Sequence, residues 1–140
     1  IYLDNAIVAK KVKVGRKTYY LCHAYVVNKR FDNEVKYNEL IYKDVFQAVW
    51  QNIYDASFVK KLNEKIFPNK RYIYVLGHIF TQRLDHVDEQ GRGLVLNDKE
   101  FLGEYHIINI DCGMALRNKS SRLACLRLED EAIFYEGIDV

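Results

Sequence analysis

The sequence predicts an α/β domain with a mixed sheet, and three observations indicate this class. A β-hairpin pattern comes early, in which Val12 and Val14 alternate with lysines before the turn Gly15-Arg16 and a second strand over 18–22. A long amphipathic helical pattern follows it. A short continuous apolar run over 72–76 then has the character of a strand in the middle of a sheet. Strands that alternate with helices along the chain are typical of α/β folds.

Two helices are predicted between the hairpin and the central strand. Apolar residues recur at helical spacing over 38–52 without an intervening Gly or Pro, which predicts a helix with a broad apolar face. Asp55 or Ser57 can cap a second helix that runs to about Ile66, and Pro68-Asn69 ends it before the next strand.

The rest of the chain is predicted to be mostly strand. Residues 81–99 are polar and contain glycines, so we expect a loop or a loosely paired hairpin around Leu94-Val95-Leu96. The later apolar segments predict three strands, 106–110, 121–128 and 132–135, of which the last two are expected to pair antiparallel.

Composition restricts the class of protein. The chain has 140 residues, of which 49% are hydrophobic, so it can form one domain with a real core. Its 21 basic and 19 acidic residues are interspersed and give a net charge of +2, so nucleic-acid binding is not predicted. Three widely spaced cysteines fit reduced thiols, and neither a secretion signal nor a membrane span is evident; we therefore expect a cytoplasmic protein.

Two histidines stand just beyond two of the predicted strands. His23 directly follows the strand 18–22, and His78 follows the strand 72–76 after a single glycine. Because an α/β sheet offers ligands at the carboxyl ends of its strands, we expect both imidazoles to converge on one metal site.

These features together resemble a known family. The segment Val12 to Ala24, the helix that carries Trp50, the step Leu76-Gly77-His78 and the segment Ile108 to Gly113 resemble, in order and spacing, the carboxyl-terminal half of the calcineurin-like metallophosphoesterases. Within that superfamily the resemblance is to the small bacterial and phage-type serine/threonine protein phosphatases and the symmetrical dinucleoside tetraphosphate hydrolases. It implies an α/β/β/α sandwich with a dinuclear metal site.

The resemblance implies a function and a set of ligands. His23 and His78 would bind the same metal of a pair of divalent ions (Mn, Fe, Zn or Ni), which would supply a hydroxide for attack on phosphoprotein or nucleotide-type phosphoesters. The family's opening motifs, Asp-x-His, Gly-Asp-x-x-Asp and Gly-Asn-His, do not occur here. We therefore expect residues 1–140, which start at Ile1 rather than Met, to form the carboxyl-terminal portion of a single phosphoesterase domain. Alone, this portion is predicted to be inactive as a hydrolase, and its uncovered sheet surface favours self-association.

Some positions depart from the family pattern. Ile79-Phe80 stands where the family has Thr-Pro, and no arginine lies near Trp50, where the phosphatases place one that binds the substrate phosphate. Arg30 and Arg83 are the candidate replacements. Asp111 either orients a ligating imidazole or forms a turn. These departures leave a second hypothesis, a catalytically degenerate phosphoesterase-like module that binds a partner.

Other conspicuous residues also have structural interpretations. His86 and His106 are expected to be structural. Cys22 could be a thiolate ligand or a nucleophile, but its side chain is expected on the opposite face of the strand from that of His23, which favours buried packing. Trp50 and Phe46 could stack on bases, yet their helical spacing favours the core.

Overall fold

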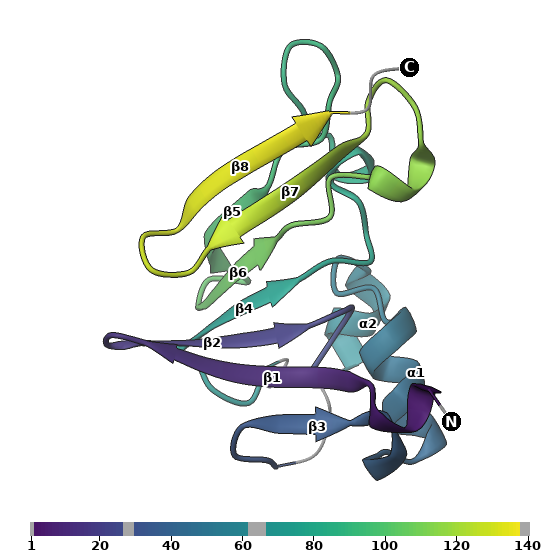
Figure 1. Cartoon of the computed structure of the whole chain (residues 1–140), viewed down its shortest axis with the longest axis vertical. Helices are drawn as coiled ribbons and strands as arrows, with labels where there is room; N and C mark the ends of the chain where they lie inside the picture. The colour runs from purple at the N-terminus through teal and green to yellow at the C-terminus, as the bar shows by residue number, and fades with distance from the viewer. Residues whose placement is uncertain (1, 27–29, 62–66, 138–140) are drawn as a thin grey trace.

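The computed structural model describes residues 2–26, 30–61 and 67–137 (Figure 1). Six strands form a mixed sheet in the order β3-β1-β2-β4-β6-β5, and two more form a separate hairpin. The elements are β1 (Ile7–Val14), β2 (Lys17–Cys22), β3 (Glu34–Lys36), α1 (Tyr42–Trp50), α2 (Ala56–Lys61), β4 (Tyr72–Leu76), β5 (Leu96–Phe101), β6 (Tyr105–Asn109), β7 (Arg122–Arg127) and β8 (Ala132–Gly137).

Three neighbouring strands in the middle of the sheet run parallel. In the observed register Leu21 of β2 pairs with Val75 of β4, and Leu76 of β4 pairs with Asn109 of β6. The carboxyl ends of β2, β4 and β6 therefore lie at one edge of the sheet, which we call the carboxyl edge. The central strand β4 is apolar throughout because a parallel strand is covered on both faces.

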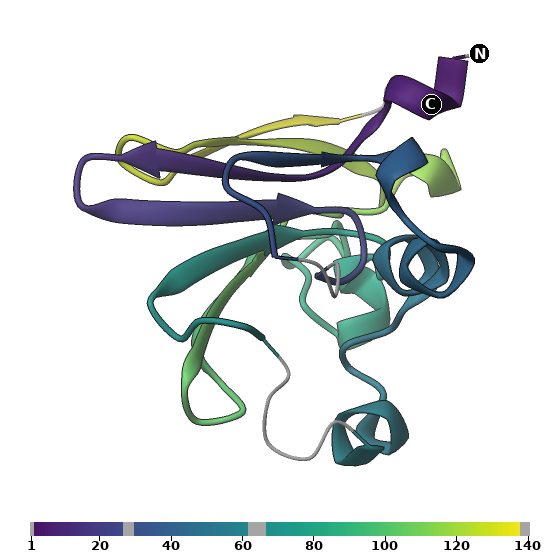
Figure 2. The same ribbon diagram turned by 90° about the horizontal axis from the view of Figure 1, so that it is seen from below.

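The two faces of the sheet are covered by different elements. Because side chains alternate along a strand, Tyr20 and Tyr74 pack with residues of both helices on one face, whereas Tyr19 and Ile73 pack with residues of β7 and β8 on the other. The result is three layers: helices, the six-stranded sheet and the two-stranded hairpin (Figure 2).

The structure confirms most of the predicted elements. The early hairpin, the strand Tyr72–Leu76 and the closing antiparallel pair are all present. The first helix begins later than predicted, at Tyr42, because a 3-10 turn occupies Tyr37–Glu39. Asp55 caps the second helix, since the backbone N–H groups of Ser57 and Phe58 donate to its Oδ1. The end predicted near Ile66 lies outside the described residues.

Two predictions need correction. The segment 81–99, expected to be a loop or a loosely paired hairpin, has one isolated antiparallel bridge between Val87 and Gly93, but its end belongs to β5, which runs antiparallel to β6 at the edge of the sheet. The prediction that Trp50 and Phe46 fill the core is wrong, because their exposed fractions are 62% and 51%. The core side of α1 is instead formed by Ala48 and Val49.

No helix in the described ranges combines the length and the apolar character that spanning a membrane requires.

Candidate functional site

His23 and His78 meet at the carboxyl edge. Their ring centroids are 5.2 Å apart and the ring planes are inclined at 66°. The backbone N–H of Gly77 donates to the carbonyl oxygen of His23 at 2.7 Å, which ties the ends of β2 and β4 together. The expectation that sequence-distant strands bring these imidazoles together is therefore met, while metal binding by the pair stays a prediction.

Asp111 lies next to this pair, two residues beyond the end of β6. A Cβ added at Gly77 would lie 3.4 Å from the Cβ of Asp111. The backbone just after β4 therefore passes close to the Asp111 side chain, which follows β6. Asp111 Oδ1 accepts a hydrogen bond from the N–H of Gly113 at 3.1 Å, as a turn-forming aspartate does. The charge of Asp111 also raises the pKa of His23, so Asp111 acts on the imidazole electrostatically, while its hydrogen bond supports the turn-forming role.

The electrostatics of the pair favour a neutral His23. Partial burial of the ring lowers the pKa of His23, the neighbouring His78 lowers the pKa further, and the Asp111 carboxylate opposes both effects. Neutral imidazole is the form that binds a metal. His23 is therefore neutral near pH 7.

His78 has an uncommon backbone conformation. Its φ angle is +70°, in the left-handed region that side chains with a Cβ rarely occupy. Such conformations cost about 1–3 kcal/mol each and cluster at functional sites. The left-handed turn carries the His78 ring onto His23 on one side and onto Trp50 on the other.

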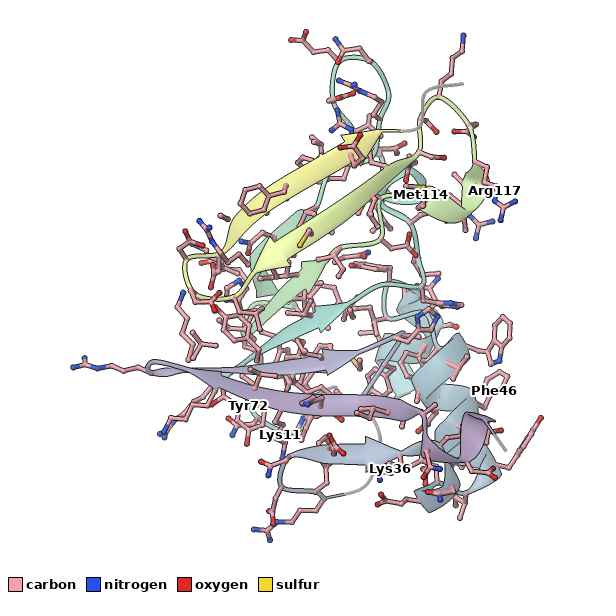
Figure 3. The ribbon with its side chains drawn as sticks, viewed as in Figure 1. Lys11, Lys36, Phe46, Tyr72, Met114 and Arg117 are labelled. Carbon is pink, nitrogen blue, oxygen red and sulfur yellow. The ribbon has the colours of Figure 1, made fainter. Side chains whose placement is uncertain are left out.

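Trp50, at the end of α1, packs against the ring of His78. Its ring centroid lies 5.8 Å from that of His78, and the planes are nearly perpendicular at 87°. Figure 3 shows Phe46, one turn earlier on α1, at the outer surface of the helix. It shows Met114 and Arg117 away from α1, next to β7. The sequence analysis favoured a core position for Trp50 over base stacking, because helical spacing alone does not show that this face of α1 is turned outward.

A pocket of about 380 Å³ opens beside the two histidines. Its lining includes His23, His78, Asp111 and Arg122. Arg122 was not singled out from the sequence. It is 9% exposed; its Nη2 lies 2.8 Å from Asp88 Oδ2, and its guanidinium lies over the ring of Tyr135.

The two arginines proposed to bind phosphate lie elsewhere. Arg83 is exposed and its guanidinium stacks on the ring of Phe80, 5.1 Å from the ring centroid. Arg30 is also exposed, and the next residue, Phe31, packs against Tyr20 in the interior of β2 rather than at its carboxyl end. Neither arginine belongs to the lining of the pocket beside the histidines.

Asn109 is a residue of the site that the sequence analysis missed. It is fully buried, donates from Nδ2 to the carbonyl oxygen of Ile79 at 2.8 Å and accepts at Oδ1 from the N–H of Asp111 at 3.0 Å. It therefore fixes the loop that follows His78 relative to Asp111. The available signal was an amide side chain between apolar neighbours in Ile107-Ile108-Asn109-Ile110.

The remaining histidines and Cys22 have structural surroundings. The His106 ring is hydrogen-bonded to Asn97 Oδ1 at 2.7 Å and the His86 ring to the carbonyl oxygen of Val95 at 3.2 Å, in keeping with the roles expected of them. Cys22 packs against the core on the helix face, and burial raises the pKa of its thiol to about 12. Such a thiol is a poor nucleophile at neutral pH.

The arrangement fits part of a ligand set for a divalent ion. Two adjacent imidazoles, one held neutral and with a carboxylate nearby, suit Mn, Fe, Zn or Ni. In the part of the chain that the structure describes, no group of three or more His, Cys, Asp or Glu side chains is placed to hold a metal ion. The described residues therefore bring two imidazoles together without a third such side chain placed to complete a metal site.

Comparison with protein-family models, with curated proteins and with solved structures finds no match to this chain.

Proposed function

We propose that this chain is part of a metal-dependent phosphoesterase, to which it contributes two imidazole ligands, His23 and His78. The observation that carries the proposal is the meeting of these rings, 5.2 Å apart, at the ends of two parallel strands. Open α/β sheets bind their ligands at this edge.

The layer order supports the proposal. Helices, a six-stranded mixed sheet and a two-stranded hairpin provide three successive layers of the kind found in an α/β/β/α sandwich. In the proposed domain the missing carboxylate ligands come from residues outside this sequence, as the resemblance implies.

The residues of the candidate site have different roles in this proposal. A pair of divalent ions, when bound, would polarise a phosphate and lower the pKa of a bound water. His23 and His78 would hold one ion, Asp111 would act on His23 through its charge, and Asn109 would keep the loops rigid. Arg122 belongs to the lining of the pocket beside the histidines, and its guanidinium, which is paired with Asp88, would bind a phosphate there only by sharing that pairing.

The test is hydrolysis of p-nitrophenyl phosphate and metal content, measured on the complete protein that contains this chain. We expect His78→Ala to lose most metal-dependent turnover, and the matched variant His106→Ala, whose ring is bonded to Asn97, to keep it. Full metal-dependent turnover in His78→Ala would remove this residue from the site. We expect the 140-residue chain alone to be inactive, because two neutral imidazoles cannot hold a dinuclear cluster without carboxylates.

A second candidate function is a catalytically degenerate binding module. It is favoured by the positions of Arg30 and Arg83, neither of which lines the pocket beside the histidines, and by Ile79-Phe80 after the Gly-His step. It predicts that the complete protein lacks turnover with every divalent ion while keeping its fold.

The proposal also covers the substrate, the cellular compartment and the self-association of the chain. The substrate would be a phosphorylated protein or a nucleotide, and the compartment would be the cytoplasm, where the free thiols of Cys22, Cys112 and Cys125 stay reduced. Self-association of the isolated chain would use exposed apolar residues such as Leu123 and Phe134 on the outer hairpin.

A further inference from the structure

One face of α1 is an aromatic stripe that is turned toward water. Tyr42, Phe46 and Trp50 follow one another at intervals of four residues, a spacing that places them along one side of a helix. Their exposed fractions are 86%, 51% and 62%. Large aromatic side chains that stay exposed in a continuous row mark a binding surface more often than isolated exposed residues do.

The stripe ends at the candidate site. Trp50 contacts the ring of His78, with 5.8 Å between centroids, and His78 contacts His23 in turn. Trp50 does not belong to the lining of the pocket beside the histidines, so a group attached to a phosphate bound there would reach the indole by extending past His78. Tyr42 lies two helical turns away from Trp50, about 12 Å along the helix axis, and is outside that reach.

We propose that Trp50 is a specificity residue, whose indole stacks on the base of a nucleoside phosphate while the phosphate lies beside His23 and His78. The position of the phosphate rests on the proposed function, whereas the stacking of the base on the indole does not. The proposal narrows the substrate class from phosphoesters in general to nucleotides.

The chemistry of the helix face favours a base over a peptide. An extended peptide is commonly held through its main chain by the open edge of a sheet. The backbone N–H and C=O groups in the interior of α1 are bonded within the helix and are not available for this. A planar base needs only an exposed aromatic face, and stacking on an aromatic side chain tolerates different bases.

The sequence offers a direct probe, because Trp50 is its single tryptophan. Its fluorescence in the 140-residue chain therefore reports on this position alone. Titrations with adenosine, AMP, ribose 5-phosphate and a phosphoserine peptide separate the base from the phosphate and from a polypeptide. We expect saturable quenching by adenosine and AMP and none by ribose 5-phosphate.

Variants that lack Trp50 have lost the fluorescent reporter, so their affinity for AMP is measured by equilibrium dialysis instead. Trp50→Leu is expected to weaken AMP binding roughly 5- to 100-fold, the range that loss of one aromatic stacking partner produces. Trp50→Phe keeps a ring and should recover much of the affinity. The matched control Tyr42→Leu, on the same helix face, should stay within about twofold of the wild type.

The outcomes separate this inference from the proposed function. If zinc binds through His23 and His78 but AMP affinity is unchanged in Trp50→Leu, the stacking proposal is overturned and the metal proposal stands. If AMP quenches Trp50 but no zinc binds to the histidines, the stacking proposal stands and the metal proposal fails. Quenching by the phosphoserine peptide without quenching by AMP would assign the surface to a polypeptide and overturn the inference.

Discussion

The two ends of the three parallel strands each carry ionisable side chains, but these are held in different ways. At the amino end the Tyr19 hydroxyl donates to the carbonyl oxygen of Leu128 at 2.9 Å, and Lys17 Nζ donates to Glu131 Oε1 at 2.7 Å. His106, also at this end, is hydrogen-bonded to Asn97. These contacts tie the sheet to the hairpin β7-β8 and to the edge strand β5.

At the carboxyl end the side chains contact one another instead. The rings of His23 and His78 meet edge to face, Trp50 packs on His78, and no hydrogen bond of either imidazole is found among the described residues. The loops behind them are nevertheless firmly bonded through Asn109 and Gln82. The same residue type, histidine, is thus hydrogen-bonded within the sheet at one end and packed against other rings at the other.

The largest effect should come from the loops behind the site. Gly113 has a φ of +77°, and a Cβ there would lie 2.5 Å from Gln82 Nε2, an atom that donates to the carbonyl oxygens of Cys112 and Ser120. Gly113→Ala should destabilise the fold by about 3 kcal/mol, through backbone strain and displaced hydrogen bonds. Gly91→Ala is the matched control, because φ is +74° and nothing lies within 4 Å, so only about 1 kcal/mol is expected. Urea unfolding measures both, and equal losses would show that Gln82 gives way freely.

A smaller effect is expected at the amino end. Tyr19 is fully buried, and Tyr19→Phe leaves the carbonyl oxygen of Leu128 and the Glu131 carboxylate with one donor fewer. The expected loss is about 1–2 kcal/mol in free energy of unfolding. His23→Ala, at the other end, should change this free energy by no more than about 0.5 kcal/mol. A larger loss in His23→Ala than in Tyr19→Phe would contradict the contrast between the two ends.

The backbone at His78 provides the third comparison. Both His78→Gly and His78→Ala remove the imidazole, but only glycine adopts a φ near +70° without strain. The glycine variant should therefore be more stable than the alanine variant by about 1 kcal/mol in thermal or urea unfolding. Equal stability of the two variants would mean that the loop relaxes and that His78 holds no strain.

The fold could be predicted from the sequence wherever a local pattern decides the structure. The turn Gly15-Arg16 and the apolar run of β4 were sufficient to predict the hairpin and the central strand. The strand β5 was missed because its polar residues suit an edge, and an edge is defined by its neighbours rather than by its own pattern.

The site could be predicted only in part, for a similar reason. Strand ends were sufficient to predict that His23 and His78 meet, since parallel strands end at one edge. The exposure of Trp50 depends on how α1 lies on the sheet, and the role of Asn109 depends on loops from two other segments. The spacing of apolar residues along the sequence predicts neither the exposure of Trp50 nor the hydrogen bonds of Asn109.

The smallest effect concerns the charge of His23. Its pKa should lie below the ordinary value of 6.5, so His23 is neutral above that pH, and protonation as the pH falls below 6.5 should destabilise the folded state. In an NMR titration His78→Ala should raise the pKa of His23, because the neighbouring imidazole lowers it, and Asp111→Asn should lower it, because the carboxylate raises it. Shifts of the opposite sign would mean that the three side chains are arranged differently.

The central claim is that His23 and His78 bind one metal ion together, and a zinc titration of the 140-residue chain followed by NMR of its four histidine rings tests it directly. We predict that the imidazole nitrogens of His23 and His78 shift in parallel and saturate together, while His86 and His106, which are hydrogen-bonded within the fold, stay unchanged. Zinc that shifts neither ring of the pair, or that shifts all four rings alike, would contradict the claim.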